Sequence, residues 1–466
     1  MTRPSAIRRV SGPRIGAAIT CAAILGAPGA AWAEPALALD PARVQGIERP
    51  AVQEGDGLRD AAAALFFIPR EMMRLAFLAG GVSAGLVRDE QVVPRVGELL
   101  SPSPGNLSVI PSLFVDTRRR ASFGAQMIGS GRESGTRLSF GFGGVHDVLG
   151  EARVRFGFAR PLPIVLSIDV LADARSTLDY LGVGQEPKLD PRNVFRPDTL
   201  MRSAIYYEQR VRGIASVGAR VATDWEVFVS ASLLKSKVQD TPDGDLNSIS
   251  RVFAAGTIPG APLAGSGCGA STCAATSRLL YSELALRLDT RISPARPSSG
   301  VLVEGYAGVA HGLGDDSSRF YRLGGRAALF VSIQRPTNIL SPRLLIDGMA
   351  VASGAPEPPF TALVSQPDFR GLDTRRDRVS LVASLDYRWS VVRYLGARLF
   401  VDVATVGPDF GAMLSAPKRI AGGFGFDVSS KSTELAQLVV SFSGEGARVL
   451  LTFGVPTLFG DRQHRY

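Results

Sequence analysis

The sequence predicts an all-β protein, a 16-stranded antiparallel transmembrane β-barrel with a short helical N-terminal segment. Apolar and polar residues alternate with the period of two that strands require. Leu399 and Val401 share one face, for example, and Arg398 and Asp402 share the other. The alternating segments are about 9–13 residues long, which is enough to cross hydrocarbon at a tilt. Arginine and aspartate stand in mid-strand, which a water-filled lumen permits and a packed core does not.

The composition excludes several other classes of protein. Apolar residues make up 45% of the 466 residues, so the chain carries too much apolar surface to stay disordered. The 51 glycines and 30 prolines follow no period, which excludes collagen and a coiled coil. The net charge of +9 comes without a clustered basic recognition motif. We therefore expect no nucleic-acid partner.

Residues 1–33 have the layout of a secretory signal peptide. Met1 to Arg14 carries four arginines and no acid, Ile15 to Pro28 is apolar, and Ala31-Trp32-Ala33 matches an A-x-A cleavage site. The alternative is an N-terminal transmembrane anchor, for which this apolar run is short and rich in alanine and glycine. We expect export to the bacterial outer membrane.

The segment 34–106 differs from the rest of the chain and is expected to precede the barrel, which takes residues 107–466. A stretch near 58–87 is rich in Ala, Leu, Phe and Met and predicts a helix. Pro69, in the middle of this stretch, is followed by Glu71, which fits a helix that starts near Pro69. Three placements stay open: on the inner leaflet, against the periplasmic rim, or inside the lumen as a plug.

Sixteen alternating segments follow, separated by breaks rich in glycine, proline and polar residues. An even number lets both ends of the barrel domain face the periplasm, and long loops are expected on the outer rim. The expected strands are 112–130 (with a possible break at Asp116 to Arg120), 136–144, 150–160, 164–176, 201–211, 212–222, 224–236, 277–290, 299–311, 319–333, 343–353, 378–390, 395–405, 418–428, 435–443 and 447–455. The expected long loops are 177–200, 237–276, 312–318, 354–377 and 406–417. Aromatic residues near strand ends predict interfacial belts; they are Tyr206, Tyr207, Phe320, Tyr321, Trp389 and Tyr394.

Two cysteines, Cys268 and Cys273, remain once the expected signal peptide is removed. They lie in a segment rich in glycine and serine, and in an exported protein they predict a small loop disulfide. A pair of free thiols is the alternative. The three histidines, His146, His311 and His464, lie far from these cysteines in the sequence, so we expect no metal and no cofactor. No serine–histidine motif or phosphate loop is recognisable, and we expect no enzyme.

A family motif stands in the C-terminal third. A long loop carries Phe369-Arg370-Gly371-Leu372, and the next two strands carry Asp386-Tyr387-Arg388 and Leu399 to Ala404. This order resembles the bacterial surface antigen family, the barrel class of outer-membrane protein assembly factors and two-partner secretion transporters. The family has Val/Ile-Arg-Gly-Phe/Tyr in the loop, Glu-Tyr-Arg in the next strand and Phe-Phe-Asp-x-Gly in the one after. Leu178 to Gly184 is similar to its Phe-Tyr-Gly-Ile-Gly element.

The resemblance implies that Arg370 folds into the lumen and meets Asp402, with Asp386 as a second candidate. A guanidinium in a narrow lumen needs carboxylate partners, so the pair would hold the loop inside and partly close the pore. Gly371 would let the backbone turn sharply. The alternative is that Arg370 is a solvated loop residue.

The chain departs from the family pattern in the loop and at the N-terminus. Phe369 replaces a β-branched residue, Leu372 replaces an aromatic one, and Ala404 replaces a glycine. The segment 34–106 predicts mostly helix, so we expect none of the periplasmic repeats that assembly factors carry. The resemblance spans about 58–459 and is specific over 366–404.

The function implied by the resemblance is insertion or translocation of polypeptide, or of lipid, at the outer membrane. A weak seam between the first and last strands would offer an edge to a client strand. The expected partners are outer-membrane lipid, lipopolysaccharide and unfolded client polypeptide, and the oligomeric state stays open. Arg118 to Arg120 and Arg375-Arg376 would bind lipopolysaccharide or head-group phosphates, or form a solvated rim. A passive pore or structural surface protein with a loop-constricted lumen is the alternative function.

Overall fold

The computed structural model describes residues 107–453, apart from 118, 131–133, 159–162, 242–246, 255–256, 260–273, 292–296, 334, 393–394 and 430–433. The expected signal peptide, the helix near 58–87 and the cysteine pair Cys268 and Cys273 lie outside the described residues. So do Tyr394, Arg118 and the side chains of Arg119 and Arg120. Within them, no helix is long and apolar enough to cross a membrane.

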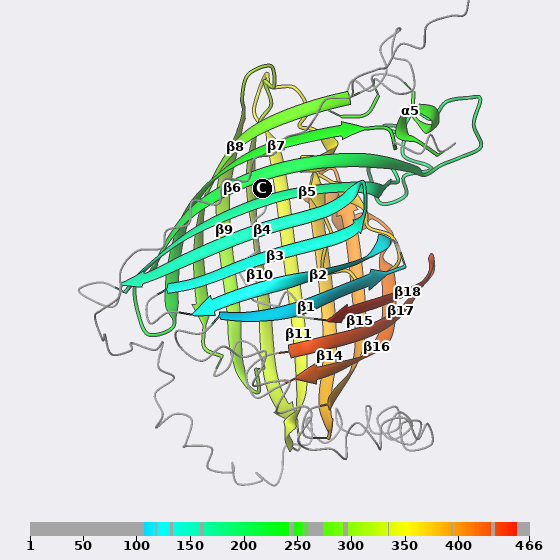
Figure 1. Ribbon diagram of the computed structural model, residues 1–466. Coiled ribbons are helices and arrows are strands. Elements are labelled where there is room, and N and C mark those ends of the chain that lie inside the picture. Colours follow the sequence, from blue (N-terminus) through cyan, green and yellow to red (C-terminus); the bar gives the residue numbers. More distant parts are fainter. Residues whose placement is uncertain are drawn as a thin grey trace, which may run out of the picture. The chain divides into compact units, whose positions relative to one another are not determined.

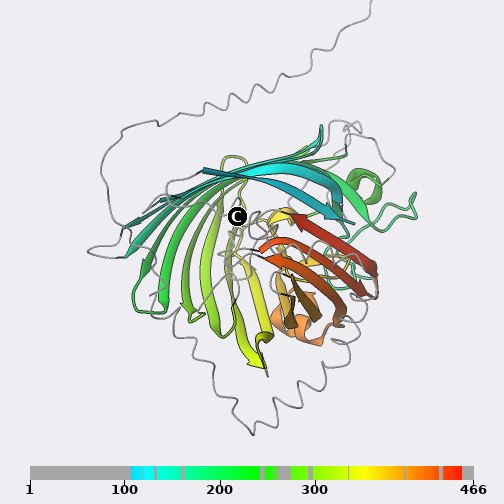
Figure 2. The ribbon, with the colours of Figure 1, turned by 60° about the horizontal axis from the view of Figure 1, so that its bottom comes forward.

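Sixteen antiparallel strands close into one barrel, as the sequence predicts (Figures 1 and 2). Each barrel strand pairs with the barrel strands before and after it, and β1 completes the ring against β18. The barrel strands are β1 (Leu107–Asp116), β2 (Arg119–Ser130), β3 (Ser134–Gly144), β4 (Asp147–Phe158), β5 (Ile164–Tyr180), β6 (Ala204–Arg220), β7 (Trp225–Gln239), β8 (Ala274–Asp289), β9 (Gly300–Gly312), β10 (Arg319–Ile333), β11 (Arg335–Val351), β14 (Val379–Val392), β15 (Leu395–Gly407), β16 (Arg419–Ser429), β17 (Glu434–Ser443) and β18 (Gly446–Phe453).

The strand count is right, but two of the expected boundaries are wrong and their errors cancel. The expected strand 112–130 is two strands, β1 and β2, which turn at the possible break. The expected strands 201–211 and 212–222 are one strand, β6. Val211 and Arg212 are paired with β5 on one side and β7 on the other, so the ladder continues where the sequence suggested a turn.

The two faces of the wall differ as a membrane-spanning barrel requires. Apolar side chains such as Leu323 and Val401 are 63% and 49% exposed on the outer face. On the inner face Arg287 and Arg326 are buried and both pair with Glu304. A charged side chain can stay in the wall because it meets a counter-charge in the lumen.

The aromatic residues expected at the interfaces mostly lie elsewhere. Tyr206, Phe320 and Trp389 are buried, whereas Tyr321 is 48% exposed on the outer face. Tyr206 and Phe320 belong to an apolar cluster with Tyr180 and Phe360, at the rim where the long loops gather. Both residues lie near strand ends, as the sequence predicts. Their rings, however, pack under the loops rather than against lipid.

The long loops follow β5, β7, β9, β11 and β15, as expected, and therefore share one rim. The described parts of these loops contain three short helices, α5 (Ile249–Val252), η1 (Phe360–Ala362) and α6 (Phe410–Ser415). The loop between β11 and β14 also contains a two-stranded ribbon, β12 (Val364–Ser365) with β13 (Arg376–Asp377). This ribbon brackets the motif that the sequence singled out.

We expect Val401→Arg to lower the free energy of unfolding of the membrane-inserted barrel by about 2–4 kcal/mol, because it places a charge against lipid in mid-strand. Leu200→Arg is the matched control: Leu200 is 95% exposed on a loop, and its replacement is expected to change that free energy by less than about 0.5 kcal/mol. Chemical unfolding in liposomes measures both. Equal losses in the two variants would contradict the assignment of the outer face.

Candidate functional site

The guanidinium of Arg370 is held between two carboxylates of the barrel wall. Its Nε and Nη2 donate to Asp402, at 2.8 Å to Oδ2 and 2.5 Å to Oδ1. Its Nη1 donates to Asp386 Oδ1 at 2.7 Å, and Nη2 also reaches Asp386 Oδ2 at 3.0 Å. The backbone N–H of Arg370 donates to Asp402 Oδ2 at 3.0 Å. Asp402 is fully buried and the arginine side chain is 17% exposed.

The surroundings of this group explain why it can stay there. The guanidinium carbon of Arg370 lies 3.6 Å from the centroid of the Phe400 ring, a cation–π contact. Asp386 also pairs with Arg343 of β11. In a partly desolvated site, removing one partner of such a pair leaves an uncompensated charge, which costs about 3–5 kcal/mol. The structure therefore places Arg370 in the lumen with both of the acids named from the sequence.

Phe369 and Gly371, on either side of Arg370, fix the path of the loop. Phe369 is fully buried in an apolar cluster with Val382 and Ala404. A Cβ on Gly371 would lie 2.2 Å from Cε1 of the Phe369 ring, so only glycine leaves room for the ring to fold back. Phe369 and Ala404, two residues that differ from the family pattern, thus belong to the same apolar cluster.

A second motif, Leu178 to Gly184, supports the same loop from the end of β5 and the loop that follows it. Gly182 and Gly184 have φ values of +98° and +91°, a conformation that favours glycine. The N–H of Gly184 donates to the carbonyl of Arg376 at 3.0 Å. Arg192, further along this loop, donates to Asp377 at 2.9 Å and 2.7 Å. The hydrogen bond to Asp377 raises the pKa of Arg192 above its ordinary value.

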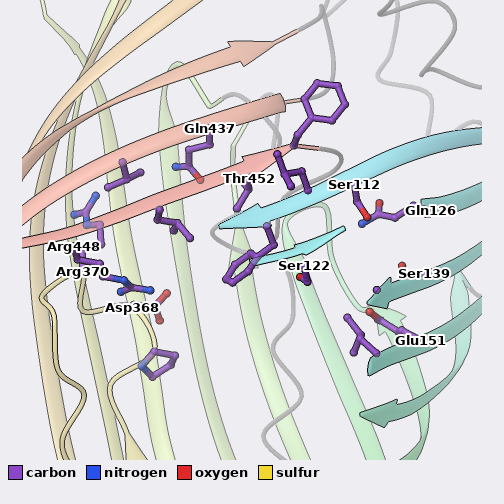
Figure 3. Close-up of a pocket in the computed structure, with 18 of the residues that line it drawn as sticks. Ser112, Ser122, Gln126, Ser139, Glu151, Asp368, Arg370, Gln437, Arg448 and Thr452 are labelled. Carbon is purple, nitrogen blue, oxygen red and sulfur yellow. The ribbon is translucent and has the colours of Figure 1, made fainter. Parts of the chain in front are cut away.

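Beside the Arg370 loop, the lumen contains a cavity of about 730 Å³ (Figure 3). Its lining combines neutral polar and charged side chains. Hydroxyl and amide groups come from Ser112, Gln126 and Thr452, and charged groups from Glu151 and Arg370. The cavity can therefore offer hydrogen bonds and charges of either sign.

The cavity is also lined by residues of β1 and β18, whose contact we call the seam. Within the described residues, the register of the seam runs from the pair Leu113–Phe453 to the pair Asp116–Leu450. On its luminal side Arg448 donates to Asp116, with Nε–Oδ1 at 3.1 Å and Nη2–Oδ2 at 2.8 Å. Asp116 is 2% exposed. Within this stretch, a bidentate ion pair thus lies on the luminal side of the ladder.

Several side chains of the site were not singled out by the sequence. Arg343 pairs with Asp386, and Gln185 bridges two loops by donating to the carbonyl of Pro417 at 2.7 Å and accepting from the N–H of Val406 at 2.9 Å. Parity along β11 places Arg343 on the inner face, so that residue could have been found. Gln185 carries no such signal, because its partners are more than 200 residues away.

The basic pair Arg375-Arg376 was expected at lipid phosphates or on a solvated rim, and the structure shows neither. Arg375 pairs with Glu445 at 2.9 Å. Arg376 donates to the hydroxyl of Tyr206 at 3.3 Å. Both arginines therefore serve contacts between loops. The described residues contain no group of His, Cys, Asp and Glu side chains that could hold a metal ion.

Fold and site together define a membrane-spanning barrel with a loop held in its lumen. The chain is similar to the structure of BamA from Haemophilus ducreyi lacking POTRA domains 1–3, with a TM-score of 0.51 and 11% identity over 75% of this chain and 70% of that chain. CdiB from Acinetobacter baumannii gives a TM-score of 0.43 and 9% identity over 74% and 60%. No family model and no curated protein matches the chain. The likeness to BamA confirms the barrel fold implied by the surface antigen motif.

We expect Arg370→Ala and Asp402→Ala each to convert small, flickering currents into large ones, because either change releases the loop from the lumen. Single-channel recording in planar bilayers measures this. Arg210→Ala is the matched control: Arg210 of β6 pairs in the lumen with Asp173 of β5, at 2.9 Å from Nε to Oδ1. Large, steady currents in the wild type that neither loop variant changes would contradict the constriction.

Proposed function

We propose that this protein inserts or translocates polypeptide at the bacterial outer membrane, without catalysing a covalent reaction. The proposal is supported by the barrel fold, by the surface antigen motif around Arg370 and, above all, by the seam. A closed barrel of uniformly paired strands has no edge to offer a client. The contact between the first and last strands is the place where such an edge can form.

The seam differs from the neighbouring strand pair in its extent. Across the last hairpin, β17 and β18 pair from Ala436–Phe453 to Ser443–Gly446. Within the described residues, β1 and β18 share only the stretch that ends at Asp116–Leu450. The N–H of Thr117 adds one bond to the carbonyl of Val449, at 3.1 Å. Among the described residues, the seam therefore has fewer paired positions than the last hairpin.

The mechanism follows from what an opened seam exposes. Separation of β1 from β18 presents unpaired N–H and C=O groups along β1, and an extended client strand can satisfy them by β-augmentation. The client would enter between lipid and lumen. Its polar face would point toward the hydroxyl of Ser112 and the amide of Gln126, which line the cavity. The Arg370 loop would meanwhile keep the lumen constricted, so that opening sideways does not open the pore to ions.

A passive pore remains the second candidate, favoured by the luminal cavity of about 730 Å³. The two functions differ in what they demand of the seam. A pore conducts with the seam closed, whereas insertion requires the seam to open.

We expect a disulfide across the seam to stop insertion. Leu113→Cys with Phe453→Cys joins two directly paired residues, in a background whose native cysteines are replaced by serine. Proteoliposomes containing the oxidised variant should fold an added unfolded outer-membrane barrel no faster than protein-free liposomes. Reduction should restore the wild-type rate.

The matched control is Leu344→Cys with Ala383→Cys, a directly paired position between β11 and β14. Its oxidised form should stay active. If the seam-locked barrel inserts clients as fast as the reduced one, insertion does not use the seam. If the wild type shows no stimulation and conducts steadily, the passive pore is the better account.

A further inference from the structure

The turn between β17 and β18 carries one acidic side chain, Glu445, which two arginines share. Arg375 of the Arg370 loop donates from Nη2 to Glu445 Oε1 at 2.9 Å. Arg419 of β16 donates from Nε to the same oxygen at 2.7 Å, and from Nη2 to Oε2. Glu445 is 23% exposed as a side chain, so these bonds are partly sheltered from water.

Arg419 extends the contact from Glu445 deep into the loop. Its Nη2 donates to the carbonyl of Asp373 at 2.6 Å, and its Nη1 to Gln366 Oε1 at 3.2 Å. Its guanidinium carbon lies 4.6 Å from the centroid of the Phe369 ring. One arginine thus holds Glu445 and both ends of the segment 366–373. A movement of the Arg370 loop would therefore be transmitted through Arg419 to the turn at Glu445.

Two further contacts tie the loop to the last hairpin. Ser441 Oγ on β17 donates to the carbonyl of Arg370 at 2.5 Å. A Cβ on Gly446, the first residue of β18, would lie 3.1 Å from Leu372 Cδ2, so Leu372 packs against the start of that strand. Gly446 has a φ of +137°, a conformation that disfavours side chains. Leu372, where the family has an aromatic, occupies the space this glycine leaves.

The same hairpin is one side of the seam. Arg448, two residues beyond Gly446, makes the ion pair with Asp116 of β1. The last strand therefore has the loop at its beginning and the first strand alongside Leu450 to Phe453. Since β18 starts at Gly446, a shift of the turn at Glu445 moves the strand that carries Arg448.

We propose that Glu445 is a positioning residue that couples the Arg370 loop to the seam. With Glu445 bound by Arg375 and Arg419, the loop holds the last hairpin in the register that lets Arg448 reach Asp116. Displacement of the loop from the lumen removes this support and makes the seam easier to open. The inference rests on the proposed function for its purpose, but its physical content, a link between loop and seam, can be measured without any client.

The test is hydrogen exchange, followed by mass spectrometry, on the purified full-length barrel in lipid nanodiscs. Glu445→Gln keeps the shape of the side chain and removes the charge. Loss of charge-assisted bonds to two arginines is expected to speed exchange in peptides covering 446–453 and 107–116 by about ten-fold. Peptides from β6 to β10 should keep their wild-type rates, because they lie away from the turn.

Glu357→Gln is the matched control. Glu357 lies in the same loop and pairs with Arg378, but it contacts neither the turn nor the last strand. This variant should leave exchange at the seam unchanged. Arg370→Ala, which frees the loop by another route, should speed exchange in 446–453 as Glu445→Gln does. Arg375→Gln combined with Glu445→Gln should give less than the product of the two single effects, because both remove the same contact.

Two results would overturn the coupling. Exchange in 446–453 that matches the wild type in Glu445→Gln would show that the turn does not hold the strand. Equal acceleration in all strands would show a general loss of stability instead of a link. If exchange at the seam responds as expected while client insertion is absent, the coupling stands and the proposed function fails.

Discussion

The pairing of Arg370 with Asp386 and Asp402 is the interaction on which the rest of the site depends. A guanidinium inside a barrel loses much of its hydration, so its carboxylate partners must be fixed before the loop can lie in the lumen. Asp386 and Asp402 stand on adjacent strands and are therefore fixed by the ladder itself. The barrel wall thus supplies two fixed carboxylates, and the loop supplies the guanidinium that binds both.

The same rule governs the remainder of the inner face. Arg153 with Asp169 joins β4 to β5, and Arg210 with Asp173 joins β5 to β6. On the far side of the barrel, Arg398 with Asp427 joins β15 to β16. Each pair neutralises a charge that the water-filled interior admits, and each adds a link between neighbouring strands beyond the backbone ladder. Stability and solvation of the lumen thus come from the same side chains.

The alternation of apolar and polar residues predicted most of the fold, because a period of two follows from strand geometry alone. It could not show that a strand continues past the membrane. β6 runs from Ala204 to Arg220, and its middle was mistaken for a turn. The partners of Arg370 could be predicted from the sequence because the motif includes a loop arginine and strand acids. The roles of Arg419 and Glu445 could not be predicted, since their contacts depend on how a loop folds back on strands distant in the sequence.

The ion pair between Asp116 and Arg448 has a consequence for how the barrel forms. The two residues are 332 positions apart in the chain. Their contact closes nearly the whole domain into a ring, and ordering so long a loop is entropically unfavourable until the strands between them are already paired. Ring closure at this pair is then the last event in assembly. An intermediate with every other strand in place would expose two free edges, on β1 and β18, until Arg448 reaches Asp116.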